Sequence, residues 1–309
     1  MVAFGLPIDT IWNQKEKALR IATLLHEGQR RVGRLSDDGQ TLALFAIDGE
    51  RGALPLAEAA ARGEAWPATD VEVPLTEAQL IAPLPAPRRN LWCVGRNYHA
   101  HAKELQTSVF KDNTKAVDAW PIVFTKAPET VVGPGAVVLL PGDAISTQID
   151  YEAELAIVIG VGGKNISKAD ALKHVWGWTI VNDVTARDVQ MRHGQWDLGK
   201  SFDTFCPMGP WIVTADELDG TNTRVRCWVN GELRQDARTT ELIFDIPTLI
   251  ETVSRGITLL PGDVIATGTP AGVGMGLSPP RWLQHGDTVL IQIDGIGTLE
   301  NTFKNGDRT

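Results

Sequence analysis

Two glutamates, Glu152 and Glu154, stand one residue apart at the start of an apolar run. Because side chains two positions apart in a strand face the same side, both carboxylates would point toward one place. Two like charges held so close are costly unless a cation lies between them, and Mg²⁺ prefers oxygen ligands. The pair therefore indicates a divalent metal site, with a solvated strand face as the alternative.

A third acid follows a second apolar run, which covers residues 175–181. Asp183 comes just after this predicted strand, where its carboxylate could join the two glutamates. Three carboxylates would leave coordination positions open for a chelating substrate and for water. We expect the neighbouring Asp188 to be structural, either pairing with Arg187 or capping a turn.

A histidine and a glutamate follow another predicted buried strand, residues 91–95. His101 and Glu104 are three positions apart, so they share a face if the segment is a short helix. A carboxylate beside an imidazole orients the ring and raises its basicity, as a general base requires; a solvent-facing ion pair is the alternative. Lys200 follows a glycine between aromatic residues and could hold an anionic substrate or an oxyanion, or lie on the surface.

Composition narrows the classes of protein that these residues could serve. The chain has 309 residues, 43% of them hydrophobic and 22% charged, as in ordinary globular proteins. The net charge of −9, without a block of Lys or Arg, argues against nucleic-acid and anionic-membrane surfaces. The 3 cysteines show neither a disulfide framework nor zinc spacing, and no apolar run could span a membrane. A reduced, cytoplasmic setting is expected.

The elements that position these residues divide at a proline-rich linker, residues 82–87, where alternate prolines exclude a helix and a central strand. Residues 1–88 form a predicted small N-terminal domain, with strands near residues 17–25, 29–34 and 41–45. Its predicted helices are residues 54–62 and 74–80. Residues 89–309 form the second predicted domain, with a hairpin turning at Asn230-Gly231 and a helix over residues 244–254.

Two loops remain open in their interpretation. Residues 106–120 are polar and irregular, which indicates either a lid or a plain surface loop. The glycine-rich residues 271–276 predict either a close backbone approach or a simple turn. Thr269, just before this loop, could hydrogen-bond a carboxylate.

Taken together, the motifs resemble the fumarylacetoacetate hydrolase family over residues 90–305, in the right order. The resemblance is closest to the shorter bacterial type, which includes acylpyruvate hydrolases, oxaloacetate decarboxylases and homoprotocatechuate-pathway isomerase/decarboxylases. The motifs are Tyr98-His99-Ala100-His101 with Glu104, Asp150-Tyr151-Glu152-Ala153-Glu154-Leu155, Asn182-Asp183-Val184-Thr185-Ala186-Arg187-Asp188, Gly199-Lys200-Ser201-Phe202-Asp203, and Thr267-Gly268-Thr269-Pro270.

The resemblance implies an α+β, mainly β fold, with a catalytic domain of rolled mixed β-sheets behind a small N-terminal α+β domain. It also implies a homodimer and Mg²⁺, for which Mn²⁺ or Ca²⁺ could substitute. The residues that match the family's functional positions are the metal ligands Glu152, Glu154 and Asp183, the catalytic residues His101, Glu104 and Lys200, and the substrate-binding residues Arg187, Gln190, Thr269, Arg96 and Lys126.

The expected reaction is hydrolysis of the carbon–carbon bond of a 2,4-diketo acid, such as an acylpyruvate, in the breakdown of aromatic compounds. The metal would stabilise the enolate that develops, while His101, oriented by Glu104, activates water. The alternative is a decarboxylase or tautomerase of a 2-oxo or 2-hydroxy-diene diacid, because these reactions share the enolate. Another carbon–carbon or carbon–nitrogen lyase of the family and a non-catalytic metabolite-binding protein are the remaining alternatives.

Overall fold

The computed structural model describes residues 19–66, 68–108, 120–192 and 194–306. Its main feature is a 12-stranded sheet. Along it lie β4 (Ala68–Pro74), β3 (Thr41–Phe45), β2 (Gln29–Leu35), β1 (Arg20–His26), β14 (Cys206–Thr214), β12 (Val175–Asn182), β11 (Ala153–Ile159), β17 (Val264–Ala266), β6 (Leu91–Gly95) and β7 (Ile122–Lys126). In addition, β5 (Gln79–Ile81) pairs with β1, and β8 (Val131–Val132) pairs with β14.

Two further sheets complete the strand structure. The 5-stranded sheet contains, in order, β16 (Glu232–Arg238), β15 (Arg224–Val229), β18 (Thr288–Ile293), β19 (Gly297–Asn305) and β9 (Val137–Leu140). The 2-stranded sheet joins β10 (Ile149–Asp150) to β13 (Thr185–Ala186). This architecture confirms the mainly β, α+β class that the resemblance implied.

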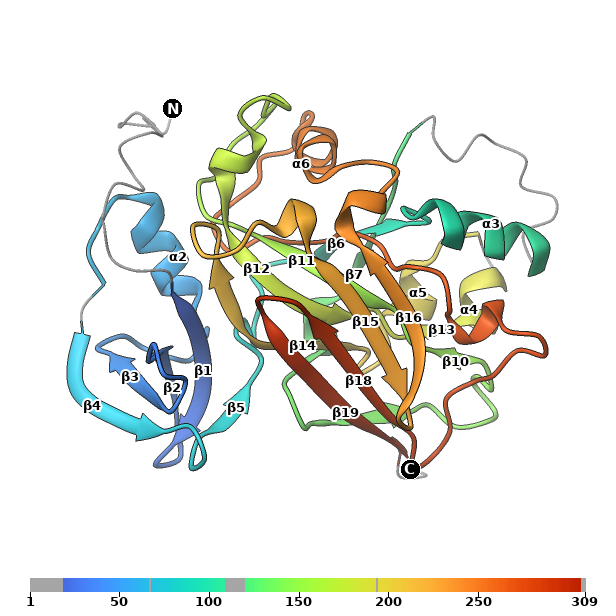
Figure 1. The fold of residues 1–309 in the computed structure, drawn as a ribbon, viewed down its shortest axis with the longest axis horizontal. Helices are drawn as coiled ribbons and strands as arrows, with labels where there is room; N and C mark the ends of the chain where they lie inside the picture. The colour runs from blue at the N-terminus through green and yellow to red at the C-terminus, as the bar shows by residue number, and fades with distance from the viewer. Residues whose placement is uncertain (1–18, 67, 109–119, 193, 307–309) are drawn as a thin grey trace.

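The helices are short. The α-helices are α2 (Leu54–Ala61), α3 (His99–Ser108), α4 (Arg187–Arg192), α5 (Asp197–Lys200) and α6 (Ile246–Ser254), and the 3-10 helices are η1 (Pro128–Thr130), η2 (Ala171–His174), η3 (Gly220–Asn222), η4 (Thr239–Glu241) and η5 (Gly274–Gly276). Figure 1 shows β1–β5 and α2 at one side of the molecule, with α3, α4 and α5 at the other. In the described ranges, none of the helices has the length and apolar character needed to cross a membrane.

The central strand β11 is buried along its whole length, which explains its continuous apolar sequence. Leu155 and Ile157 point into a core shared with β15, β18 and β19. Ala156 and Val158 point the other way, into a second core that includes Leu54 of α2. Because successive side chains alternate between the two faces, this strand is held by packing on both sides.

The leading segment continues the large sheet, because β1 pairs with β14 through Arg20–Val213 and Ile21–Ile212. The domain boundary after residue 88 stays a prediction. The helix expected over residues 74–80 is wrong: β4 ends at Pro74, and β5 lies along β1 instead. Pairing with a neighbouring strand satisfies the backbone groups of β5, which outweighs a weak local preference for helix.

Candidate active site

The three predicted metal ligands meet where β11 begins and β12 ends. These strands pair antiparallel, with Ala153 opposite Asn182, so the residues just outside this pair become neighbours. The backbone N–H of Asp183 donates to the carbonyl oxygen of Glu152 at 2.9 Å. Carboxylate oxygens of Glu152, Glu154 and Asp183 all lie within 4.8 Å of one another, and all three residues are buried.

Buried cations surround two of these carboxylates. The Lys200 ammonium lies 2.7 Å from Glu152 Oε2 and 2.7 Å from Asp183 Oδ2. Arg187 Nη2 lies 2.6 Å from Glu152 Oε1, and Lys126 Nζ lies 2.7 Å from Asp183 Oδ1. Burial alone would raise the pKa of Glu152, but the charges of Lys200 and Arg187 lower it to about 2. Glu152 is therefore ionised at neutral pH.

Glu154 has a different environment, since no ion pair reaches it from the part of the chain that the structure describes. Its Oε2 accepts a hydrogen bond from the Gly268 N–H at 2.8 Å. Burial, together with the Asp183 and Glu152 carboxylates, raises the pKa of Glu154 well above its usual value. A cation placed among the three acids would relieve this cost, so the donor set fits a hard divalent ion such as Mg²⁺.

The order of strands in the large sheet places the proposed base near the acidic cluster of Glu152, Glu154 and Asp183. β6 runs parallel to β17, and β17 pairs antiparallel with β11, so the carboxyl end of β6 lies near the start of β11. Helix α3 follows β6 and carries His101, whose Nδ1 lies 3.1 Å from Glu104 Oε2. An ionised Glu104 accepts only, so Nδ1 donates and Nε2 becomes the basic atom of the ring.

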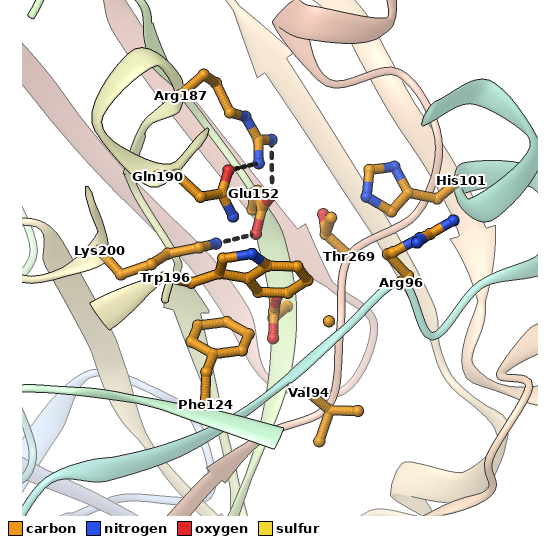
Figure 2. Close-up of a pocket in the computed structure, with 12 residues that line it drawn as sticks. Val94, Arg96, His101, Phe124, Glu152, Arg187, Gln190, Trp196, Lys200 and Thr269 are labelled. Atoms are coloured by element: carbon orange, nitrogen blue, oxygen red, sulfur yellow. Dashed lines mark hydrogen bonds and ion pairs between the residues drawn. The ribbon is translucent and has the colours of Figure 1, made fainter. Parts of the chain in front are cut away.

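These groups face one pocket, which Figure 2 shows with Lys200, Arg187 and Gln190 across from His101 and Arg96. Most of the side chains predicted for the site from the sequence line it. They are Arg96, His101, Glu152, Glu154, Arg187, Gln190, Lys200 and Thr269. The fold therefore brings together residues that lie up to 173 positions apart, from Arg96 to Thr269.

Arg187 is held from two sides. The pairing of β10 with β13 places Asp150 opposite Thr185, so its carboxylate accepts from Arg187 Nε at 2.9 Å. Arg187 Nη1 donates to Gln190 Oε1 at 3.2 Å from the next turn of α4. The guanidinium is thus fixed at the edge of the pocket before any substrate arrives.

Two predicted substrate-binding residues, Lys126 and Thr269, make contacts within the protein instead. The Lys126 side chain is fully buried outside the pocket lining and donates to the carbonyl oxygens of Val184 and Lys200. Its ammonium also contacts Asp183, so Lys126 supports a predicted metal ligand rather than the pocket surface. The Thr269 hydroxyl donates to the Ala153 carbonyl oxygen at 3.0 Å and accepts from Gln235 Nε2 at 2.7 Å.

The pocket also contains residues that sequence reasoning missed. Trp196 packs edge-on against Phe124, with ring centroids 5.2 Å apart, and the Lys200 ammonium lies 4.9 Å from the Phe124 ring centroid. A Cβ on Gly95 would lie 2.3 Å from Trp196, so only glycine admits the indole there. The aromatic residues near Lys200 were the available sequence signal, but nothing local tied them to β6 or β7.

Two open questions from the sequence have different outcomes. Asp188 is structural, as expected, and its carboxylate accepts from the Ser146 hydroxyl at 2.5 Å, the Thr147 N–H at 3.3 Å and the Val189 N–H at 2.9 Å. The alternative of pairing with Arg187 is wrong, because Arg187 turns toward Asp150 and Glu152. Residues 109–119 of the proposed lid lie outside the described part of the chain.

Known proteins share this sequence and architecture. Residues 90–304 match the family model described as fumarylacetoacetate (FAA) hydrolase C-terminal. The oxaloacetate tautomerase YisK of Bacillus subtilis (strain 168) is 50% identical over 228 residues, which cover 74% of this chain and 73% of that protein.

Solved structures of this family resemble the chain as well. A fumarylacetoacetate hydrolase from Exiguobacterium antarcticum has a TM-score of 0.81 and 40% identity, covering 93% of this chain and 100% of that chain. A 2-hydroxyhepta-2,4-diene-1,7-dioate isomerase from Mycobacterium marinum has a TM-score of 0.75 and 36% identity, covering 94% and 100%. The matched motifs, the sheet order and these similarities place this chain in the fumarylacetoacetate hydrolase family.

Proposed function

We propose that this protein interconverts the keto and enol forms of a 2-oxo diacid of the oxaloacetate type, with a divalent metal ion. The observation that carries this proposal is the 50% identity to the Bacillus subtilis oxaloacetate tautomerase. The similarity to a 2-hydroxyhepta-2,4-diene-1,7-dioate isomerase supports the same class, because an isomerase also moves a proton within its substrate. The tautomerase alternative thus has more support than the hydrolysis that the motifs first favoured.

The reaction needs a base that returns the proton it takes. Ketonisation or enolisation moves a proton between carbon 3 and the oxygen on carbon 2, breaks no carbon–carbon bond and consumes no water. His101 can accept and return this proton at Nε2 while Glu104 stabilises the imidazolium through Nδ1–H. The pair thus suits proton shuttling without any further nucleophile.

Glu152, Glu154 and Asp183 are the residues that would hold the metal ion. When bound, a divalent cation supplies Lewis acidity that favours negative charge on the keto oxygen. Lys200 adds a second positive charge beside the same place. Burial alone would lower the pKa of Lys200, but Asp183 and Glu152 raise it above its usual value, so the ammonium keeps its proton.

A diacid suits the distribution of charge around the pocket. Arg187 and Gln190 lie on one side and Arg96 on the other, as Figure 2 shows. A substrate with a carboxylate at each end would meet a guanidinium at both ends. Phe124 and Trp196 close the remaining wall with apolar surface, which reduces access of water to the enolate.

Hydrolysis of a 2,4-diketo acid is the second candidate, favoured by the TM-score of 0.81 to a fumarylacetoacetate hydrolase. The test measures three substrates with and without Mg²⁺: enol oxaloacetate, an acylpyruvate, and a 2-hydroxymuconate-type acid. A tautomerase accelerates the loss of oxaloacetate enol absorbance without forming pyruvate. Pyruvate from oxaloacetate would indicate decarboxylation, and pyruvate from the acylpyruvate would indicate hydrolysis. No acceleration with oxaloacetate would overturn the proposal.

A further inference from the structure

The glycine-rich loop after β17 is a close backbone approach, one of the two interpretations that the sequence left open. A Cβ at Gly272, where φ is +101°, would lie 1.9 Å from the Arg234 carbonyl oxygen. A Cβ at Gly276 would lie 2.0 Å from Glu104 Oε1. The absence of side chains at these positions lets the loop press directly against the β16 backbone at Gly272 and against the Glu104 carboxylate of α3 at Gly276.

The Gly272 peptide groups connect two side chains from distant parts of the sequence. The Gly272 N–H donates to Glu104 Oε1 at 3.0 Å, and the Gly272 carbonyl oxygen accepts from the Tyr151 hydroxyl at 2.7 Å. The other oxygen of Glu104 binds His101. Two hydrogen bonds to the Gly272 backbone, one on each side of its Cα, therefore link the buried Tyr151 residue to Glu104 and so to the imidazole of the proposed base.

The same loop is also held two and three residues after Gly272, at Gly274 and Met275. Asp150, which is fully buried, accepts from the Gly274 N–H at 2.7 Å and the Met275 N–H at 3.0 Å. Asp150 also accepts a hydrogen bond from Arg187, so it contacts a pocket-lining residue as well as the loop. Tyr151 differs, because its hydroxyl contacts the loop and lies outside the pocket lining.

We propose that Tyr151 is a positioning residue for the His101–Glu104 pair and acts through the Gly272 peptide groups. Resting on the proposed function, this adds a role for a residue that lies outside the pocket lining and outside the acidic cluster. The Tyr151 hydroxyl holds the Gly272 carbonyl oxygen, which keeps the adjacent N–H aimed at Glu104. That bond prevents the carboxylate from rotating away from Nδ1 of His101.

The chain supplies a matched control, because it contains two tyrosines and both are buried beside the site. Across the described ranges, the Tyr98 hydroxyl has no hydrogen-bond partner. Tyr151→Phe and Tyr98→Phe therefore remove the same atom from two buried side chains, one with a hydrogen-bond partner and one without. We expect Tyr151→Phe to lower kcat about tenfold or more, with KM and Mn²⁺ affinity within about twofold of wild type. Tyr98→Phe should leave all three unchanged.

A double-mutant cycle separates positioning from a general structural effect. If Tyr151 acts through Glu104, Tyr151→Phe should have little further effect on kcat in a Glu104→Ala background. Equal losses of kcat in both backgrounds would overturn the proposal. A loss of Mn²⁺ affinity matching the loss of kcat would also overturn it, because the defect would then lie at the acids next to Tyr151.

A second measurement does not depend on turnover. In protein labelled with ¹⁵N-histidine, the His101 ring signals, assigned with His101→Asn, report which ring nitrogen carries the proton. Tyr151→Phe should shift these signals, and Tyr98→Phe should not. Unshifted signals in Tyr151→Phe would overturn the positioning role. Shifted signals in a protein inactive on all three substrates would uphold that role and reject the proposed function.

Discussion

At the scale of single residues, the three acids of the site differ in the charges that surround them. Glu152 and Asp183 each contact two buried cations, whereas the one hydrogen bond that Glu154 receives within the described residues comes from the Gly268 N–H. Burial first, and then the uncompensated charges of Asp183 and Glu152, raise the pKa of Glu154. Stability of the metal-free protein and affinity for the metal should respond in opposite ways to its neutralisation.

Glu154→Gln tests this expectation. The substitution removes a ligand charge, so Mn²⁺ affinity should fall at least about tenfold. It also removes buried like-charge repulsion, so the metal-free protein should unfold at the same temperature or higher. Isothermal titration and thermal unfolding measure the two effects. Unchanged Mn²⁺ affinity would exclude Glu154 as a ligand, and Glu300→Gln, an exposed substitution far along the sequence, serves as the control.

His101→Asn should separate turnover from binding. The substitution removes the proposed general base, so kcat should fall about 10²- to 10⁴-fold. His101 is not among the predicted metal ligands. Mn²⁺ affinity should stay within about twofold, because Glu152 keeps its contacts with Lys200 and Arg187 and Asp183 keeps its contact with Lys200. Near-normal turnover in this variant would assign the base to another residue.

At the scale of elements, strand order rather than strand content builds the site. The predicted hairpin at Asn230-Gly231 is confirmed, with both residues at positive φ, 51° and 79°. The predicted helix over residues 244–254 is confirmed as α6, capped by the Asp245 side chain, which accepts from the Thr248 N–H. Such local patterns could be predicted because they depend on a few neighbouring residues.

The 5-stranded sheet provides a matched pair for testing the packing of the core. Leu299 on β19 is 1% exposed, and Leu233 on β16 is 49% exposed. Leu299→Ala removes buried contacts with the large sheet and should lower the free energy of unfolding by about 2–5 kcal/mol. Leu233→Ala should change it by less than about 0.5 kcal/mol. Denaturant unfolding distinguishes them, and equal effects would contradict the assigned orientation of this sheet.

At the scale of the whole molecule, the leading segment and the catalytic part share a sheet and a core. β1 pairs with β14, and Leu54 and Leu56 pack in the same cluster as Val158. We therefore expect residues 89–309, produced alone, to aggregate or unfold at a markedly lower temperature, because deletion exposes apolar surface and a strand edge. A fragment as stable as the full chain would support an independent N-terminal domain.

Metal binding should also be visible in the stability of the entire chain. A ligand that binds the folded state alone adds about 2.7 kcal/mol at a concentration of about 100 times its Kd. Treatment with a chelator should abolish turnover and lower the unfolding temperature, and Mg²⁺ or Mn²⁺ should restore both. Glu154→Gln provides the control, since the added metal should stabilise it much less. The homodimer and the cytoplasmic setting stay predictions, for which sedimentation and cell fractionation are the measurements.

Much of the candidate site could be predicted from the sequence because its chemistry is local in character. Paired acids such as Glu152 and Glu154 reveal themselves by spacing, and a His–Glu pair reveals itself by helical periodicity. Tyr151, Asp150 and Trp196 could not be found in this way. Their roles depend on contacts that are distant in the sequence. Tyr151 and Gly272 lie 121 positions apart, and Asp150 and Arg187 lie 37 apart. Trp196 packs where Gly95, from strand β6, leaves room.

By itself, the sequence determined the types of group available: three acids for a cation, a base with its carboxylate, and a set of cations for an anionic substrate. The tertiary structure alone decided which of these groups meet. The register of β11 against β12 sets Glu152 beside Asp183, and the parallel pairing of β6 with β17 brings His101 within reach. Side-chain chemistry belongs to each residue, whereas proximity depends on strand pairing and burial across the entire chain.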